Sequence, residues 1–151
     1  MFLIGNSIDY HKLVEKRNST IKLGGVPIKV NYQIVAHSDG DLILHAIANA
    51  VLGAKSKEDI GTYFPDTKKS NKNINSIKIL KKALSFLNKN EYINNIDLTI
   101  ICDKILLKNH IKKIKNNLIN LLKCTRIAIK ATRFEENKNL ISCYCSLLIN
   151  N

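Results

Sequence analysis

The sequence predicts an α+β domain in which one sheet is covered by helices. Stretches with strand-like and helix-like spacing of apolar residues alternate along the chain, and neither an internal repeat nor a linker interrupts them. The 151 residues, 45% of them hydrophobic, suffice for one hydrophobic core. We therefore expect a single domain over residues 1–151.

In the first half of the chain, turn-forming residues separate the predicted elements. The Leu23-Gly24-Gly25-Val26-Pro27 sequence is typical of a turn between two short strands. Beyond it, apolar residues recur at helical spacing, with acidic residues near the start and Gly53 near the end. The predicted elements are strands at residues 2–9, 20–23 and 26–30, a helix at 38–52, and a short helical turn with a loop at 55–67.

In the second half, amphipathic helices alternate with strands rich in β-branched residues. The helices place Ile and Leu on one side and Lys on the other, which indicates one buried face each. The predicted elements are a polar loop at residues 68–75, a helix at 75–88, a strand at 93–102, a helix at 109–122, and strands at 127–132 and 140–149.

The net charge of +12 does not by itself indicate nucleic-acid binding. The chain has 21 Lys but only 3 Arg, no Trp and 6% aromatic residues, whereas proteins that bind nucleic acid favour Arg and interleaved aromatic residues. We therefore expect no nucleic-acid partner. Residues 31–54 contain neither Lys nor Arg, which favours a buried or metal-binding segment there.

Apolar runs of only a few residues predict no membrane span, and the start of the chain lacks a signal-peptide pattern. The four cysteines have no CxxC spacing, which favours a reducing compartment and argues against a disulfide framework. We expect a cytoplasmic protein of bacterial type. A plastid protein whose transit peptide has been removed is the alternative.

Three residues form a candidate metal centre. Asp9 and His11 stand two apart in a predicted strand, so their side chains leave the same face. His45 lies in the middle of a predicted helix, with Asp41 four residues earlier to orient its imidazole. One Asp and two His leave one position of a tetrahedral Zn²⁺ open, as in a catalytic site. The alternatives are a surface turn for the first pair and a solvent-facing edge for the helix.

Polar loop residues nearby suit phosphate and sugar. His37 and Ser38 stand at the expected start of a helix, where backbone N–H groups attract anions, although Ser38 also fits a simple N-cap. Asp59-Ile60-Gly61 and Phe64-Pro65-Asp66-Thr67 each offer a carboxylate beside a turn, suited to sugar hydroxyls. Taken alone, each of these two segments fits an ordinary loop better than a binding site.

Together these segments resemble the 2-C-methyl-D-erythritol 2,4-cyclodiphosphate synthase family. The motifs follow the family's order over about residues 2–135. The matching segments are Ile4-Gly5, Asp9-Tyr10-His11, Leu23-Gly24-Gly25-Val26, His37-Ser38-Asp39-Gly40-Asp41 with His45, Leu52-Gly53-Ala54, Asp59-Ile60-Gly61, Phe64-Pro65-Asp66-Thr67, Asp97-Leu98-Thr99-Ile100-Ile101 and Lys130-Ala131-Thr132.

The resemblance implies an enzyme of the non-mevalonate isoprenoid pathway, a phosphorus–oxygen lyase. Such enzymes cyclise 4-diphosphocytidyl-2-C-methyl-D-erythritol 2-phosphate and release CMP. Asp9, His11 and His45 would hold Zn²⁺, and Glu135 would hold Mg²⁺ or Mn²⁺ between the substrate phosphates. His37 and the residue at position 133, here Arg133, would act at the transition state.

The resemblance also implies a set of residues that contact the nucleotide-diphosphate substrate. They are Asp9, Tyr10, His11, His37, Ser38, Asp59, Ile60, Gly61, Phe64, Asp66, Lys68, Cys102, Lys104, Lys108, Thr132 and Glu135. The implied fold is one mixed four-stranded sheet with helices on one face. Three subunits would pack their sheets about a threefold axis as a homotrimer, which accounts for a last strand that is apolar on both faces.

The sequence departs from the family pattern near its end. A Pro-Lys pair is missing near Ile105-Leu106, Arg133 replaces a threonine, and the glycine-rich Gly-Arg-Gly-Glu-Gly stretch after Glu135 is absent. Asn49 stands where an aspartate is expected. These changes leave open a non-catalytic homologue kept as a trimeric scaffold, and the charge leaves open a basic polyanion-binding protein.

Overall fold

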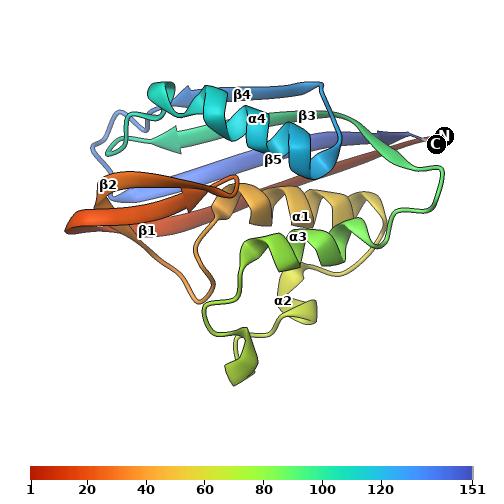
Figure 1. The fold of residues 1–151 in the computed structure, drawn as a ribbon, viewed down its shortest axis with the longest axis horizontal. Coiled ribbons are helices and arrows are strands. Elements are labelled where there is room, and N and C mark those ends of the chain that lie inside the picture. Colours follow the sequence, from red (N-terminus) through yellow and green to blue (C-terminus); the bar gives the residue numbers. More distant parts are fainter. Residues whose placement is uncertain (151) are drawn as a thin grey trace.

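The computed structural model describes residues 1–150 as one mixed sheet with helices packed against it (Figure 1). Along the chain the elements are β1 (Phe2–Leu23), β2 (Val26–Val35), α1 (Leu42–Ala54), α2 (Ile60–Tyr63), η1 (Lys69–Asn71), α3 (Ser76–Leu84), β3 (Tyr92–Cys102), η2 (Leu107–Asn109), α4 (Ile111–Leu122), β4 (Ile127–Thr132) and β5 (Leu140–Asn150). The predicted α+β class is confirmed.

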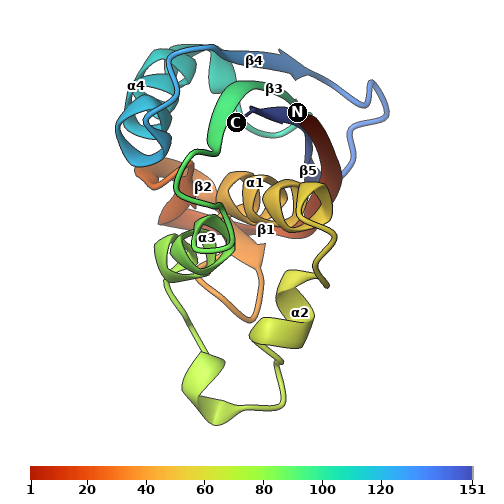
Figure 2. The same ribbon diagram turned by 90° about the vertical axis from the view of Figure 1, so that its right-hand side faces the viewer.

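The sheet has five strands in the order β2-β1-β5-β3-β4, so the expectation of four strands is wrong. β3 and β4 are parallel, and the other neighbouring strands are antiparallel. The sheet is strongly curled, and its strands wrap around α1 (Figure 2).

β1 is one continuous strand where the sequence predicted two separate pieces. Its first half pairs with β5 and its second half with β2, across an irregularity between Glu15 and Ser19 where Asn18 has a φ of 53°. The polar residues around this bulge break the strand pattern in the sequence, although the backbone pairing continues on both sides. β2 likewise extends to Val35, beyond the predicted end at residue 30.

α1 is the buried centre of the domain. Eleven of its residues are buried, and the side chains of Leu42, Ala46 and Ala50 have no exposed surface. This burial explains the absence of Lys and Arg from α1, because an unpaired buried charge is costly. The predicted burial is confirmed for most of residues 40–54, whereas most of residues 31–39 are exposed or half-buried.

The start of α1 differs from the predicted start at residue 38. The helix begins at Leu42, four residues after the predicted start, because Gly40 has a φ of 74° and breaks the helical path. Asp41 is the N-cap, and its carboxylate accepts from the backbone N–H of Leu44 at 3.2 Å. Residues 37–40 therefore form a loop ahead of the helix.

The other helices are shorter than predicted. α3 ends at Leu84 and α4 begins at Ile111, where the sequence predicted ends at residue 88 and a start at residue 109. Lys123, with a φ of 54°, ends α4 in a left-handed conformation. None of the helices in the 150 residues that the structure describes is long and apolar enough to cross a membrane.

The two faces of the sheet differ in what covers them. α1 and α4 pack against the concave side, and α2 and α3 pack against α1 (Figures 1 and 2). The opposite side exposes large apolar residues of β1 and β5, with Ile8 directly opposite Tyr144 in the strand register. These exposed residues are Phe2, Ile4, Ile8, Tyr10 and Tyr144. We call them the apolar outer face.

The contact between α1 and β1 generates a stability prediction. An added Cβ at Gly5 would lie 1.8 Å from the backbone oxygen of Ala50, so Gly5→Ala forces the helix off the strand. We expect a loss of about 3 kcal/mol or more in the free energy of unfolding, measured by urea denaturation at fixed protein concentration.

Gly53→Ala is the matched control for this prediction. A Cβ at Gly53 meets only Asn6 O at 4.0 Å, and Gly53 lies within α1. We expect a gain of about 0.5 kcal/mol from the higher helix propensity of Ala. Equal effects of the two substitutions would contradict the close approach of α1 to β1 at Gly5.

Candidate active site

The side chains of Asp9, His11 and His45 meet between β1 and α1. Asp9 and His11 project from the same face of β1, and α1 presents His45 to them. Asp9 Oδ2 lies 3.3 Å from His11 Nε2 and 3.2 Å from His45 Nδ1. One possible ligand atom from each residue lies within 4.8 Å of the other two, so this triad can hold a divalent cation.

Two atoms of the triad lack hydrogen-bond partners among residues 1–150. Asp9 Oδ2 and His11 Nε2 are buried, yet neither makes a hydrogen bond despite the short distance between them. Burial favours the neutral form of Asp9, but the adjoining imidazoles of His11 and His45 outweigh it and lower its pKa to about 2. An ionised carboxylate and a ring nitrogen without a hydrogen-bond partner are suitable ligands for a cation.

The remaining ring nitrogen of His45 faces two serine hydroxyls. Nε2 lies 2.9 Å from Ser76 Oγ and 3.2 Å from Ser38 Oγ. The predicted role of Asp41 as the orienting carboxylate is wrong, because its oxygens accept from the backbone N–H groups of Gly24 and Gly25 at 2.8 and 2.5 Å. The capping geometry turns this carboxylate toward the β1–β2 turn.

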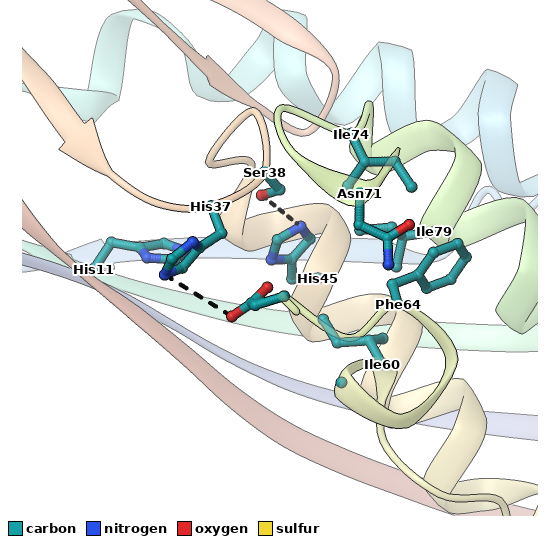
Figure 3. A pocket seen from close by; sticks show the side chains of 11 residues that line it. His11, His37, Ser38, His45, Ile60, Phe64, Asn71, Ile74 and Ile79 are labelled. Carbon is teal, nitrogen blue, oxygen red and sulfur yellow. Dashed lines mark hydrogen bonds and ion pairs between the residues drawn. The ribbon is translucent and has the colours of Figure 1, made fainter. Parts of the chain in front are cut away.

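A cavity of about 200 Å³ opens beside the triad (Figure 3). His11, His37 and His45 line it together with residues of the 60–79 segment, and Ser38 comes from the loop ahead of α1. Eight predicted site residues line it, namely His11, His37, Ser38, His45, Ile60, Gly61, Phe64 and Asp66. Asn71, Ile74 and Ile79 also line it, although no motif in the sequence indicates them.

Side-chain contacts hold the loop that closes this cavity. Asp59 caps α2 by accepting from the backbone N–H of Thr62 at 3.0 Å, and Asn49 Oδ1 accepts from the N–H of Ile60 at 2.9 Å. His37 Nε2 lies 3.9 Å from Asp66 Oδ2, with both side chains largely exposed. Asn49, which departs from the family pattern, thus fixes this loop to α1.

A second, smaller cavity of about 120 Å³ lies between the end of β3, η2 and the end of β4. Four predicted site residues line it, namely Cys102, Lys108, Thr132 and Arg133. Burial raises the pKa of the Cys102 thiol, so this cysteine is a poor nucleophile at neutral pH. Cys143 and Cys145 are buried within β5.

Six predicted site residues line neither cavity, namely Asp9 and Asp59, whose contacts are given above, and Tyr10, Lys68, Lys104 and Glu135. Tyr10 is 66% exposed on the apolar outer face, opposite to Asp9 and His11, because neighbouring strand residues alternate faces. Lys68 is exposed on the polar loop before η1, and Glu135 is exposed in the loop after β4 with a φ of 62°. Lys104 donates to Asn137 Oδ1 at 2.6 Å.

Comparison with known proteins decides the family. The YgbB family model matches residues 2–150. The chain belongs to the YgbB family. The 2-C-methyl-D-erythritol 2,4-cyclodiphosphate synthase of Mycoplasmoides gallisepticum is 43% identical over 149 residues, which cover 97% of this chain and 96% of that relative.

Solved structures of similar proteins agree with this assignment. A 2C-methyl-D-erythritol-2,4-cyclodiphosphate synthase superposes with a TM-score of 0.89 at 30% identity, over 97% of this chain and 99% of the other. IspF of Plasmodium falciparum, solved as a CDP complex, gives a TM-score of 0.83 at 33% identity, over 98% and 95% of the two chains. The resemblance inferred from the motifs is confirmed.

In this YgbB chain, Asp103 organises the shortened segment after β4. Its carboxylate accepts from the backbone N–H groups of Phe134 and Lys138, each at 2.8 Å, and from that of Glu135 at 3.3 Å. Residues 133–138 thus fold around one side chain, and positive φ angles at Glu135 and Asn137 complete the turn. No local sequence pattern indicates this role of Asp103, because its three partners lie more than thirty residues away.

We predict that Asp103→Ala loosens this loop without unfolding the domain. Removing an acceptor of three backbone N–H groups should speed hydrogen exchange at Phe134 and Lys138 by at least about tenfold. Glu136→Gln is the matched control, because the Glu136 carboxylate pairs with Lys138 Nζ and its removal leaves the Asp103 contacts in place. Equal protection in both variants would contradict the anchoring role.

The same anchor depends on pH. Partial burial opposes ionisation of Asp103, but the three backbone donors outweigh it and hold its pKa below the ordinary value. Because the native pKa is lowered, the anchoring is complete above the unfolded-state pKa of about 3.9 and is lost as pH falls through the native pKa. An NMR titration of the Phe134 and Lys138 amide signals measures this loss.

Proposed function

We propose that this chain is a metal-dependent 2-C-methyl-D-erythritol 2,4-cyclodiphosphate synthase, a phosphorus–oxygen lyase of isoprenoid precursor biosynthesis. It converts 4-diphosphocytidyl-2-C-methyl-D-erythritol 2-phosphate to the cyclic diphosphate and CMP. The observation that carries the proposal is the Asp9–His11–His45 triad at the edge of a cavity that His37 and Ser38 also line. The activity named for the 43% identical relative supports the same reaction.

The triad is the proposed Zn²⁺ site. Its buried, unpartnered Asp9 Oδ2 and His11 Nε2 fit a dication, and two imidazoles with one carboxylate match the ligands of catalytic zinc. Bound zinc supplies Lewis-acid stabilisation of charge on a phosphoryl oxygen. The three residues fix the position at which that stabilisation acts.

The substrate supplies its own nucleophile. An oxygen of the 2-phosphate attacks the β-phosphorus, the bond from that phosphorus to the bridging oxygen breaks, and CMP leaves with the bridging oxygen. His37 and Ser38 line the cavity beside the triad, where a ring N–H and a hydroxyl can donate to phosphate oxygens. They hold and orient the phosphate that attacks.

The nucleotide requires further contacts. Asp59, Ile60, Gly61, Phe64 and Asp66 form the loop proposed to hold the ribose and erythritol hydroxyls, with Lys68 nearby. Cys102, Lys104, Lys108, Thr132 and Arg133 are proposed to hold the base and its phosphates, and Glu135 a second cation, Mg²⁺ or Mn²⁺. The cavity between β3 and β4 and the CDP complex of the Plasmodium falciparum relative support this assignment.

A homotrimer is the proposed assembly, formed by three copies of the apolar outer face. Ile4 is 74% exposed there, and a contiguous apolar surface on a sheet favours association with another copy. Tyr10 would then lie between subunits. We also propose that the chain acts as one domain in the cytoplasm, where its four free, buried cysteines stay reduced.

A non-catalytic descendant of the family is the second candidate. Arg133 in place of threonine and the shortened loop at residues 133–138 favour it. Release of CMP from the authentic substrate by the purified protein separates the two candidates. Zinc bound without any CMP release would favour the scaffold.

We predict that His45→Ala abolishes both zinc occupancy and CMP release. The substitution removes one of three ligands and the only one that α1 contributes. Metal analysis and a CMP assay measure the two effects. Gly53→Ala, on the same helix and away from the triad, should keep both. Full turnover by His45→Ala would refute the metal assignment.

We predict a solution mass of about three times the 17.1 kDa chain, measured by sedimentation. Ile4→Lys places a charge in the apolar outer face and should shift the protein toward the monomer at micromolar concentration. Lys113→Glu, on the exposed side of α4, is the control for a changed surface charge and should leave the mass unchanged. A monomeric wild type would overturn the proposed assembly.

A further inference from the structure

A chain of buried polar contacts leads away from the metal triad on the far side of His45. His45 Nε2 lies 2.9 Å from the hydroxyl of Ser76, the first residue of α3. Ser76 is fully buried and only 6% of His45 is exposed. The contact joins α1 to α3 through two side chains that water hardly reaches.

The Ser76 hydroxyl is itself bound to Asp39. It donates to Asp39 Oδ1, which also accepts from the backbone N–H of Ser76. Lys22 Nζ donates to the other oxygen, Asp39 Oδ2, at 3.1 Å. Partial burial raises the pKa of Asp39, but the hydrogen bonds from Ser76 and Lys22 outweigh that effect and lower it. Asp39 is therefore an ionised carboxylate that can only accept.

This arrangement favours a proton on Nε2 of His45, whereas the ionised Asp9 attracts a proton to Nδ1 as long as no cation is bound between them. A serine hydroxyl has one hydrogen, and Asp39 takes it. Ser76 Oγ can therefore only accept from the ring, which requires a proton on Nε2. The neutral imidazole then has its lone pair on Nδ1, the atom that lies 3.2 Å from Asp9 Oδ2.

We propose that Ser76, held by Asp39, is a positioning residue that fixes His45 in its Nε2-protonated form and so leaves Nδ1 free to bind the metal. The inference rests on the proposed metal site. It assigns to a serine the role that a carboxylate or a carbonyl commonly has behind a metal-binding histidine, with the carboxylate of Asp39 one step further away.

The same contacts involve the cavity wall. Ser38 Oγ accepts from the backbone N–H of Gly40 at 3.1 Å and lies 3.2 Å from His45 Nε2 (Figure 3). Because Nε2 already carries a proton, it cannot accept the proton of Ser38. The Ser38 hydroxyl therefore keeps its hydrogen for an anion in the cavity.

Backbone hydrogen bonds join the loop ahead of α1 to the segment ahead of α3. The N–H of Asp39 donates to Ile74 O at 3.1 Å, and the N–H of Asn73 donates to His37 O at 2.8 Å. Displacing Ser76 would disturb His45 and the cavity wall at once.

The first test removes the carboxylate of Asp9, which competes for the proton of His45 from the other side of the ring. In metal-free, full-length Asp9→Ala protein at about pH 8, where an ordinary histidine is neutral, two-dimensional ¹⁵N NMR of the imidazole rings reports which nitrogen is protonated. We expect His45 to carry its proton on Nε2, with His45→Ala used to assign the signals. A proton on Nδ1 would overturn the proposal.

The second test measures zinc affinity by competition with a chromophoric chelator, with zinc as the only ligand. Ser76→Ala removes the acceptor of the Nε2 proton, and we expect its Kd for zinc to rise about 10- to 100-fold. Ser7→Ala is the matched control, since Ser7 Oγ donates to Ala46 O of the same helix and does not contact His45. Its Kd should stay within about twofold of wild type.

A third variant keeps Ser76 but removes the carboxylate that accepts its hydroxyl proton. In Asp39→Ala the Ser76 hydroxyl has lost its acceptor and can donate to Nε2, so we expect some His45 with the proton on Nδ1 and a weaker zinc site.

A Ser76→Ala Kd for zinc within twofold of the wild-type Kd would overturn the proposal. Wild-type protein that binds no zinc would overturn the proposed function instead, and the tautomer measurement in the metal-free protein would still decide the role of Ser76.

Discussion

The close approach of α1 to β1 is the constraint on which the triad depends. Gly5 has no side chain, so the backbone of α1 at Ala50 lies against the strand with no room for even one carbon between them. That spacing brings His45 Nδ1 to 3.2 Å from Asp9 Oδ2. If a side chain at position 5 separated α1 from β1, His45 would lie too far from Asp9 and His11 to share a cation with them.

The polar residues of α1 each fix a different part of the chain. Asp41 at the N-cap, His45 and Asn49 stand one turn apart on an otherwise apolar helix, and each side chain makes contacts within the protein. Asp41 holds the β1–β2 turn, His45 reaches β1 and Ser76, and Asn49 holds the N–H of Ile60. The helix is therefore a central support whose few polar groups set the positions of the loops around the cavity.

The segment after β4 shows how a shortened loop can keep a defined shape. Asp103, directly after β3, accepts from three backbone N–H groups of this segment and so holds its shape. Arg133 and Thr132 line the smaller cavity directly before this loop. The geometry of the proposed nucleotide contacts thus depends on a residue of the neighbouring strand.

The sequence by itself determined the α+β class, the strands after β2, the family and the motif residues around the larger cavity, because local periodicity and turn chemistry act over a few residues. It could not reveal that β1 is continuous, since a bulge interrupts its pattern while pairing with two different strands holds it together. Only the tertiary structure decided that Asp41 turns away from His45 and that Ser76 faces it. Those contacts join residues distant in the chain, and their geometry follows from how α1, α3 and the sheet pack.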